Sequence, residues 1–151
     1  MNSKLLAYRP PRIAMLLTAL AIGAHLVTPL GNTHVFQSSV FGALFGLAGF
    51  AVMMQAWWQF RQERVAICPT SDTDHLITTG IYAFSRNPMY LGLTMMLLGA
   101  AVWQGTLPFY ATASAYLLII NNAFCPYEED KLTAAFGDQF KQYRSTVRRW
   151  L

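Results

Sequence analysis

The charged residues of this chain are gathered in three segments, and the positions between these segments are mostly apolar. They fall within residues 1–12, 61–86 and 128–149, which leaves two charge-free stretches, 13–60 and 87–127, of 48 and 41 residues. A helix that spans a bilayer needs about 20 mostly apolar residues, so each stretch has room for two helices joined by a turn. The pattern predicts helices over residues 13–27, 35–60, 88–103 and 107–124.

The predicted helix ends carry residues that are typical of membrane boundaries. Arg12 precedes the first helix, and Trp57 and Trp58 close the second, where indole rings settle at the interface. Gly42 and Gly46 have the spacing of a close helix contact, and we expect them to pack within the protein rather than between copies. The third and fourth helices are short for full spans, which predicts tilting or local thinning of the bilayer.

Two further segments complete the predicted fold. Residues 61–87 form a polar loop of about 27 residues, a length that is unusual in so small a protein and often functional. Residues 128–151 are predicted to form an amphipathic helix on the membrane surface or over the end of the bundle. Its apolar stripe consists of Leu132, Phe136, Phe140, Tyr143, Val147 and Trp150. The fold class is therefore an all-α, polytopic membrane bundle of four transmembrane helices, forming a single domain over 1–151 with hairpins at 13–60 and 88–124.

Composition supports a membrane protein. The chain is 54% hydrophobic and 12% charged, whereas soluble domains carry about 25% charged residues. This excludes an ordinary soluble enzyme, a disordered chain and a disulfide scaffold. The net charge is +4, but the basic residues lie at helix ends, so the positive-inside rule explains them better than nucleic-acid binding.

The distribution of basic residues also predicts the topology. The turns at 28–39 and 104–108 contain no Lys or Arg, so the three charged segments should share one side of the membrane. We expect an integral protein of a bacterial inner membrane with both termini in the cytoplasm. The alternative is a cleaved signal peptide over 1–25, which the long apolar segment directly after it disfavours.

No residue pattern indicates a metal site. Cys68 and Cys125 have no metal-ligand spacing, and both are expected to be reduced thiols at the cytoplasmic boundary. His25 and His34 stand alone in or beside an apolar segment, and we interpret them as packing or interfacial residues.

Polar side chains are predicted to meet where the second hairpin begins and ends. Arg86, Asn87 and Tyr90 lie at the start of the third helix, and Glu128 and Glu129 follow the fourth. Antiparallel neighbours bring these groups to one end of the bundle, where buried polar groups are costly unless they are paired or functional. Each has a simpler interpretation, with Arg86 as a membrane anchor, Asn87 as a helix cap and the glutamates as a helix start.

The run 76–92, the pair Glu128-Glu129 and the pattern from Leu132 to Tyr143 resemble the isoprenylcysteine carboxyl methyltransferases, including their bacterial branch, and the related phospholipid methyltransferases. The resemblance covers about residues 58–150 and implies S-adenosyl-L-methionine as methyl donor. The donor contacts that it implies are Asp74, His75, Leu76, Ile77, Gly80, Tyr82, Asn87, Pro88, Met89, Tyr90 and Glu128.

The chain departs from the family pattern at three positions. Asn87 replaces the usual His, which excludes a base there but not a donor contact. Phe124 replaces an arginine that engages the substrate in eukaryotic members, which argues against a prenylcysteine acceptor. Asp74 replaces another His. For the catalytic step we consider Arg86 and Glu129, which either brace one another or handle the acceptor.

The resemblance implies a membrane methyltransferase that acts at the cytoplasmic interface. The acceptor would be a lipid or another lipophilic small molecule with a carboxylate, thiol or amine, entering sideways between helices for in-line methyl transfer. One alternative is an NADPH-dependent membrane reductase related to sterol reductases. Another is a non-catalytic membrane bundle. The sequence leaves the oligomeric state open.

Overall fold

The computed structural model describes residues 10–27, 33–63 and 75–151. The regular elements within them are all helical, which confirms the all-α class. They are α2 (Pro10–Val27), α3 (Ser39–Gln62), the short 3₁₀ helix η2 (Gly80–Ala83), α4 (Pro88–Gln104), α5 (Leu107–Ile119), the π-helical turn η3 (Ile120–Phe124) and α6 (Cys125–Thr146). By length and composition α2 and α3 are able to cross a membrane, whereas α4 and α5 have 17 and 13 residues.

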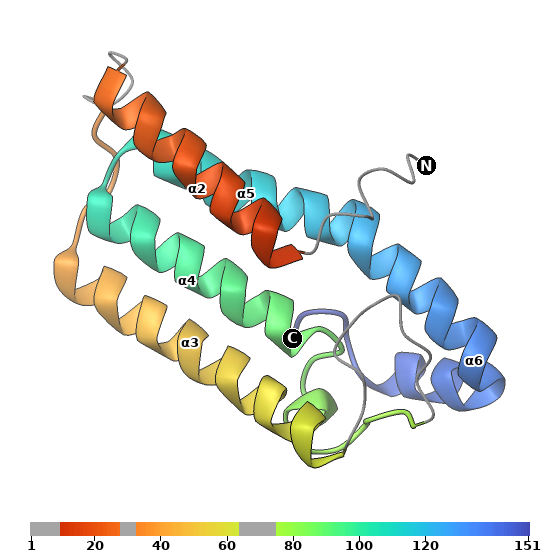
Figure 1. The fold of residues 1–151 in the computed structure, drawn as a ribbon. Helices are drawn as coiled ribbons and strands as arrows, with labels where there is room; N and C mark the ends of the chain where they lie inside the picture. Colours follow the sequence, from red (N-terminus) through yellow and green to blue (C-terminus); the bar gives the residue numbers. More distant parts are fainter. Residues whose placement is uncertain (1–9, 28–32, 64–74) are drawn as a thin grey trace.

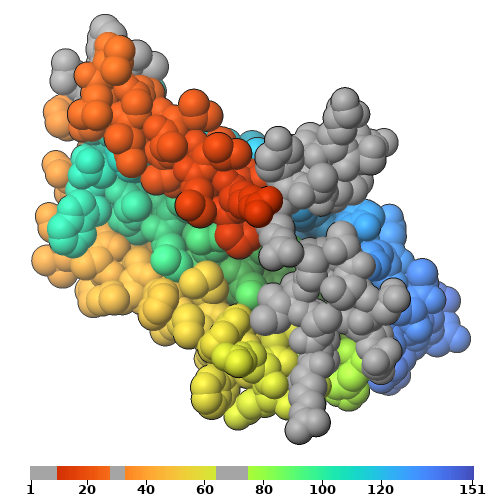
Figure 2. Space-filling view, in the orientation of Figure 1, coloured from red at the N-terminus to blue at the C-terminus, as the bar shows by residue number. Residues whose placement is uncertain are grey.

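The four helices α2 to α5 lie side by side in one bundle. Figure 1 shows α4 in the middle, with α3 on one side of it and with α5 and α2 on the other. The space-filling view in Figure 2 shows α2, α4 and α3 next to one another on one face. The end of α3, the start of α4 and the whole of α6 lie at the same end of the bundle, which is the end that carries the predicted site.

Local sequence explains where the helices begin and end. The Ser38 side chain accepts a hydrogen bond from the Phe41 amide, so α3 begins at residue 39, later than the predicted residue 35. Pro88 opens α4 at a position where its missing N–H costs nothing. Gly105, with a φ of 70°, ends α4 in the left-handed conformation that glycine adopts without strain.

Glycines bring α3 and α4 into backbone contact. A Cβ atom on Gly49 would lie 2.6 Å from the carbonyl oxygen of Gly92, and one on Gly42 would lie 2.7 Å from the amide nitrogen of Trp103. Gly46 takes part through its backbone, because a Cβ on Gly99 would lie 2.6 Å from its nitrogen. The expectation that Gly42 and Gly46 pack within the protein is confirmed, and a side chain at Gly42, Gly49, Gly92 or Gly99 would collide with the facing helix, whereas Gly46 has space for one.

One part of the core lies between α2 and the long helical stretch formed by α5 and η3. Ile13 and Ala14 of α2 are buried against the aromatic and aliphatic side chains of α5 and η3. At the opposite end of the bundle, His25 packs edge-on against Phe109 and lies 3.4 Å from the Thr106 hydroxyl. His25 is therefore a packing residue, as predicted.

Large apolar side chains cover the outer faces of α2 and α3. The most exposed include Met15, Leu20, Leu26, Val40, Leu47 and Trp58. Water-soluble proteins rarely expose so continuous an apolar surface, and such surfaces mark interaction with a membrane or another protein. These faces agree with a membrane environment.

The C-terminal part differs from the prediction. The chain passes from α5 through η3 directly into α6, so the tail helix begins at Cys125 rather than at 128. It bends at Gly137, whose φ of 51° only glycine adopts readily, and it ends at Thr146 instead of continuing to 151. Residues 147–151, called the C-terminal segment below, turn back onto the bundle. They do so because Arg149 and Trp150 find polar partners there, which helical periodicity does not reveal.

The apolar stripe of α6 faces the protein. Phe140 and Tyr143 are buried against Leu76 of the loop between α3 and α4, and Leu132, Phe136 and Val147 pack around them. Of the two predicted locations for the tail helix, the structure shows the one over the end of the bundle.

Candidate active site

One hydrogen bond joins the start of α4 to the start of α6. Tyr90, in the first turn of α4, donates from its hydroxyl group to Oε1 of Glu128, in the first turn of α6, over 2.5 Å. The fully buried Pro88 begins α4 and thereby sets the position of Tyr90. Two of the predicted donor contacts, one at the start of α4 and one at the start of α6, thus meet at one end of the bundle.

The neighbouring carboxylate, Glu129, is the centre of a buried ionic cluster. It is only 6% exposed. Arg149 binds it at two points, from Nε to Oε1 and from Nη2 to Oε2, each over 2.9 Å. Nη1 of Arg86 lies 3.0 Å from Oε1, and the half-exposed Arg144 lies 3.9 Å from Oε2. Two-point arginine pairs of this kind are strong and directional. The predicted proximity of Arg86 and Glu129 is thus observed, but Arg149 binds both oxygens of the Glu129 carboxylate.

Two buried nitrogen atoms of the Arg86 guanidinium have no hydrogen-bond acceptor among the described residues. Its side chain is 10% exposed, yet among the described residues Nε and Nη1 have no hydrogen-bond partner. Nη1 is close to Glu129 without pointing at it, so this contact is a charge interaction rather than a directed hydrogen bond. Unpaired buried donors are costly, and these N–H groups are free to bind a carboxylate or another acceptor on a ligand.

The turn before α4 is held by the C-terminal segment. Ser85 donates from its hydroxyl group to the Arg149 carbonyl over 3.1 Å, and the Asn87 side-chain amide donates to the same oxygen over 3.3 Å. The Arg86 amide donates to the Arg148 carbonyl over 3.0 Å. Asn87 precedes α4 as predicted, but its side chain makes no capping hydrogen bond and is used by Arg149 instead.

The other predicted donor contacts form the packing layer beneath this turn. Ile77 and Tyr82 are buried in one cluster with Ala56 and Met89, and the Tyr82 carbonyl accepts a 2.6 Å hydrogen bond from Tyr143. Leu76 packs on α6, as described above. These side chains therefore pack next to the turn before α4 and hold it in place.

Two remaining predicted contacts lie at the surface or in a turn, and one falls outside the described structure. Gly80 has a φ of 59° and sits against the Gln59 side chain, which donates to the Thr79 carbonyl over 2.9 Å. His75 is largely exposed and lies 3.8 Å from Glu63. Asp74 lies outside the described residues, as does Cys68.

The two adjacent glutamates have opposite electrostatic environments. Burial raises the pKa of Glu128 to about 7, although the hydrogen bond from Tyr90 and the charge of Lys131 act in the other direction. Burial also disfavours ionisation of Glu129, but the hydrogen bonds of Arg149 and the arginine charges outweigh it and hold the pKa of Glu129 below its usual range. Glu129 is therefore a fixed negative charge, whereas Glu128 changes protonation near neutral pH.

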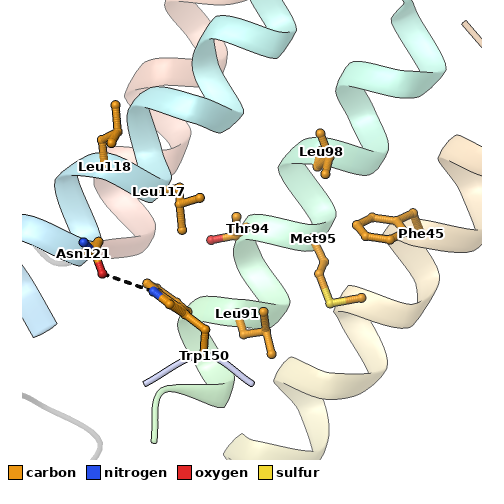
Figure 3. Close-up of a pocket in the computed structure, with 9 residues that line it drawn as sticks. All are labelled: Phe45, Leu91, Thr94, Met95, Leu98, Leu117, Leu118, Asn121 and Trp150. Carbon is orange, nitrogen blue, oxygen red and sulfur yellow. Dashed lines mark hydrogen bonds between the residues drawn. The ribbon is translucent and has the colours of Figure 1, made fainter. Parts of the chain in front are cut away.

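An apolar groove of about 450 Å³ runs between α3, α4 and α5 beside this cluster. Figure 3 shows Leu91 and Leu98 of α4, Leu117 of α5 and Phe45 of α3 along its walls. Trp150 closes one end, where its indole nitrogen donates to Asn121 Oδ1 over 3.1 Å (Figure 3). None of the predicted donor contacts lines the groove, so the groove and the polar cluster are neighbouring but separate features.

The sequence prediction did not place Arg149 or Asn121 at the site, and it assigned Trp150 only to the apolar stripe of the tail helix. The signal for Asn121 was present, because Asn121 and Asn122 interrupt a long apolar run, and the structure shows that they lie in the π-helical turn. Arg148 and Arg149 are adjacent basic residues of the predicted tail helix, so the sequence does not distinguish the partly buried one from the exposed one.

Taken together, an apolar helical bundle with a cluster of paired polar groups at one end is typical of membrane-associated enzymes and binding proteins. Comparison with known proteins narrows this class. Residues 37–139 match the model of the phospholipid methyltransferase family, and the chain belongs to that family. The match contains all the predicted site residues, whereas Arg149 and Trp150 lie beyond it.

Two relatives agree with this family. An uncharacterized protein of Haemophilus influenzae is 36% identical over 63 residues, which is 42% of this chain and 100% of that protein. The protein-S-isoprenylcysteine O-methyltransferase of Schizosaccharomyces pombe is 31% identical over 116 residues, which is 75% of this chain and 48% of that protein. The chain thus spans about half the length of the yeast enzyme. No solved structure matches. The predicted resemblance is confirmed, and the family is one of membrane methyltransferases.

Proposed function

We propose that this protein is an S-adenosyl-L-methionine-dependent methyltransferase that acts on a lipophilic or amphiphilic acceptor. The observation that carries this proposal is the meeting of Tyr90 and Glu128 beside the buried donors of Arg86, at the end of the bundle where the apolar groove also ends. Family membership supplies the reaction class.

The charges of Arg86 and Glu128 are complementary to the charged groups of the donor. The amino-acid end of S-adenosyl-L-methionine carries a carboxylate and an ammonium group. The unpartnered N–H groups of Arg86 are suited to the carboxylate, and the Glu128 carboxylate is suited to accept N–H or O–H groups. When bound, this donor supplies a methyl group that its sulfonium already activates.

The tasks left to the protein are positioning and exclusion of water. The electron-rich face of Tyr90 is suited to a sulfonium, an attraction worth ~0.5–2 kcal/mol. Glu128, with a pKa of about 7, is able to hold or release a proton at its carboxylate near neutral pH. Glu129, saturated by arginines, braces Arg86 and does not take part in proton transfer.

The groove supports an acceptor with a hydrocarbon chain. Its volume of about 450 Å³ falls within the ~300–1,000 Å³ of small-molecule sites. Its walls are apolar and it lies between helices, so a chain can reach it from the side while a reactive head lies near the polar cluster. The head group remains one of three classes, namely a carboxylate, a thiol or an amine.

The same proposal includes the arrangement in the membrane. Helices α2 to α5 cross the bilayer, with the α6 end on the cytoplasmic side of a bacterial inner membrane and both termini on that side. The support is the exposed apolar surface of α2 and α3 and the placement of the arginines at the α6 end.

Donor binding tests the proposal. Titration calorimetry in detergent with S-adenosyl-L-methionine is expected to show binding to the wild type and binding weaker by about tenfold or more in Glu128→Gln, since a charged hydrogen bond contributes ~1.5–3 kcal/mol. Asp138→Asn is the matched control, because this α6 carboxylate is exposed and pairs with Lys141. Equal affinity in both variants removes Glu128 from the site.

Mass spectrometry of ligands that copurify with the protein separates the reaction classes. The proposal expects the methyl donor or its demethylated product. A nicotinamide nucleotide would indicate a reductase, which the family match does not favour.

A further inference from the structure

We propose that Arg149 is a positioning residue of the methyl-transfer site, and that the C-terminal segment is a functional part of this site. The inference rests on the proposed function. It concerns a residue outside the family match, which ends at residue 139. The polar partners of the Arg149 side chain are Glu129 and Asn121, not Tyr90 or Glu128, but Arg149 holds the two elements that carry Tyr90 and Glu128.

The Arg149 side chain connects α6 to the π-helical turn. Its Nε and Nη2 atoms bind the two oxygens of Glu129, next to Glu128 in the chain. Its Nη1 atom donates to the backbone and side-chain oxygens of Asn121 over 3.2 Å and 3.1 Å. The regular ladder of helix hydrogen bonds is interrupted in a π-helical turn. One guanidinium therefore fixes both the turn and the start of α6.

The Arg149 backbone holds the start of α4. Its carbonyl accepts from Ser85 and Asn87, and the preceding carbonyl accepts from the Arg86 amide. These three residues immediately precede α4, and Tyr90 lies in the first turn of that helix. Arg149 thus connects Glu129 on α6 to the turn before α4. Through this connection it fixes the position of Tyr90 relative to Glu128 and the position of the Arg86 side chain.

The adjacent residue makes no equivalent contacts. The Arg148 side chain is exposed, and only its backbone carbonyl takes part in the turn. A simple membrane anchor would need only the positive charge, which Arg148 supplies equally well. The placement of Arg149 indicates a geometric role instead.

The test compares Arg149→Gln with Arg148→Gln in the full chain in detergent. Calorimetry with S-adenosyl-L-methionine is expected to show binding about tenfold weaker or more in Arg149→Gln, since a displaced Glu128 or Arg86 loses a charged hydrogen bond to the donor, and no change in Arg148→Gln. Equal affinity in the two variants overturns the inference.

Chemical rescue separates positioning from general stability. In Arg149→Ala, added ethylguanidinium is expected to restore donor binding, whereas ethylammonium is not, because only the guanidinium reproduces the two-point contact with Glu129. Weakened binding that neither compound restores, or that both restore alike, contradicts the role. If Arg149→Ala does not fold, Arg149→Lys takes its place and is expected to fold but to bind the donor weakly; donor affinity equal to the wild type then overturns the inference.

A readout independent of the donor keeps this test separate from the proposed function. Hydrogen exchange of peptides covering residues 84–90 is expected to speed up in Arg149→Gln and not in Arg148→Gln. If the wild type binds no donor, the proposed function fails, but faster exchange still supports Arg149 as the residue that holds this turn. Unchanged exchange overturns it.

Discussion

Tyr90 and Glu128 lie 38 positions apart in the chain and are joined by a 2.5 Å hydrogen bond between the first turns of α4 and α6. The next residue along α6, Glu129, points into a separate arginine cluster. Adjacent carboxylates thus have different surroundings, one able to titrate near neutral pH and the other permanently ionised. This division of roles leads to the first two predictions.

Glu128 is expected to make stability decrease as pH rises. Its pKa in the folded state is about 7, above the ordinary value of 4.5, so the folded state holds the proton more tightly than the unfolded state. The stabilisation is fully present below about pH 4.5 and is lost as pH rises to about 7. Thermal unfolding in detergent between pH 5 and pH 8 is expected to show this decrease in the wild type and a smaller one in Glu128→Gln. The same slope in both proteins contradicts it.

Glu129→Gln is expected to destabilise the protein by about 3–5 kcal/mol, because Arg86 and Arg149 lose the carboxylate that compensates their partly buried charges. Asp138→Asn, on the same helix but exposed, is expected to change the free energy of unfolding by less than about 0.5 kcal/mol. Chemical unfolding in detergent measures both. A Glu129→Gln variant as stable as the control shows that the cluster does not support the fold.

The backbone contact between α3 and α4 predicts a clear difference between two alanine substitutions on one helix. Gly49→Ala places a Cβ 2.6 Å from the Gly92 carbonyl oxygen, whereas Gly46→Ala meets no atom within 4 Å. Overpacking costs about 1–3 kcal/mol, while a helical glycine replaced by alanine without a steric clash gains about 0.5–1 kcal/mol. Unfolding measurements that give the two variants equal stability contradict the helix packing.

Filling the groove is expected to affect the acceptor but not the donor. Leu98→Trp adds bulk to the wall of the groove, and Leu47→Trp adds the same bulk on the exposed face of α3. With a long-chain acceptor, Leu98→Trp is expected to raise KM about tenfold, because excluding about two CH₂ groups of the acceptor from the groove costs ~0.8 kcal/mol each. Leu47→Trp is expected to leave KM unchanged. Donor affinity is expected to stay the same in both. An unchanged KM in Leu98→Trp places the acceptor elsewhere.

The parts of the fold that depend on local pattern were predictable from the sequence. Charge-free stretches located the helices, and Pro88 located the start of α4. The meeting of Tyr90 with Glu128 followed from two antiparallel helices joined by a short turn. In each case the information lies in neighbouring residues or in a simple topology.

The parts that depend on tertiary contacts were not predictable. The apolar stripe continues to Trp150, so periodicity extended the tail helix through a segment that turns back to reach Glu129 and Asn121. Arg148 and Arg149 look alike in the sequence, and only the fold decides which of them is partly buried. The groove likewise arises from three helices whose relative positions no local pattern specifies.

The central claim is that the α6 end of the bundle binds a methyl donor for transfer to a lipophilic acceptor. The most direct measurement is incubation of membranes containing the protein with S-adenosyl-L-methionine labelled in its methyl group, followed by extraction into organic solvent. We predict that label enters an extractable species with the wild type and falls about tenfold or more with Glu128→Gln. Label that is absent with the wild type, or equal in the two proteins, would contradict the account.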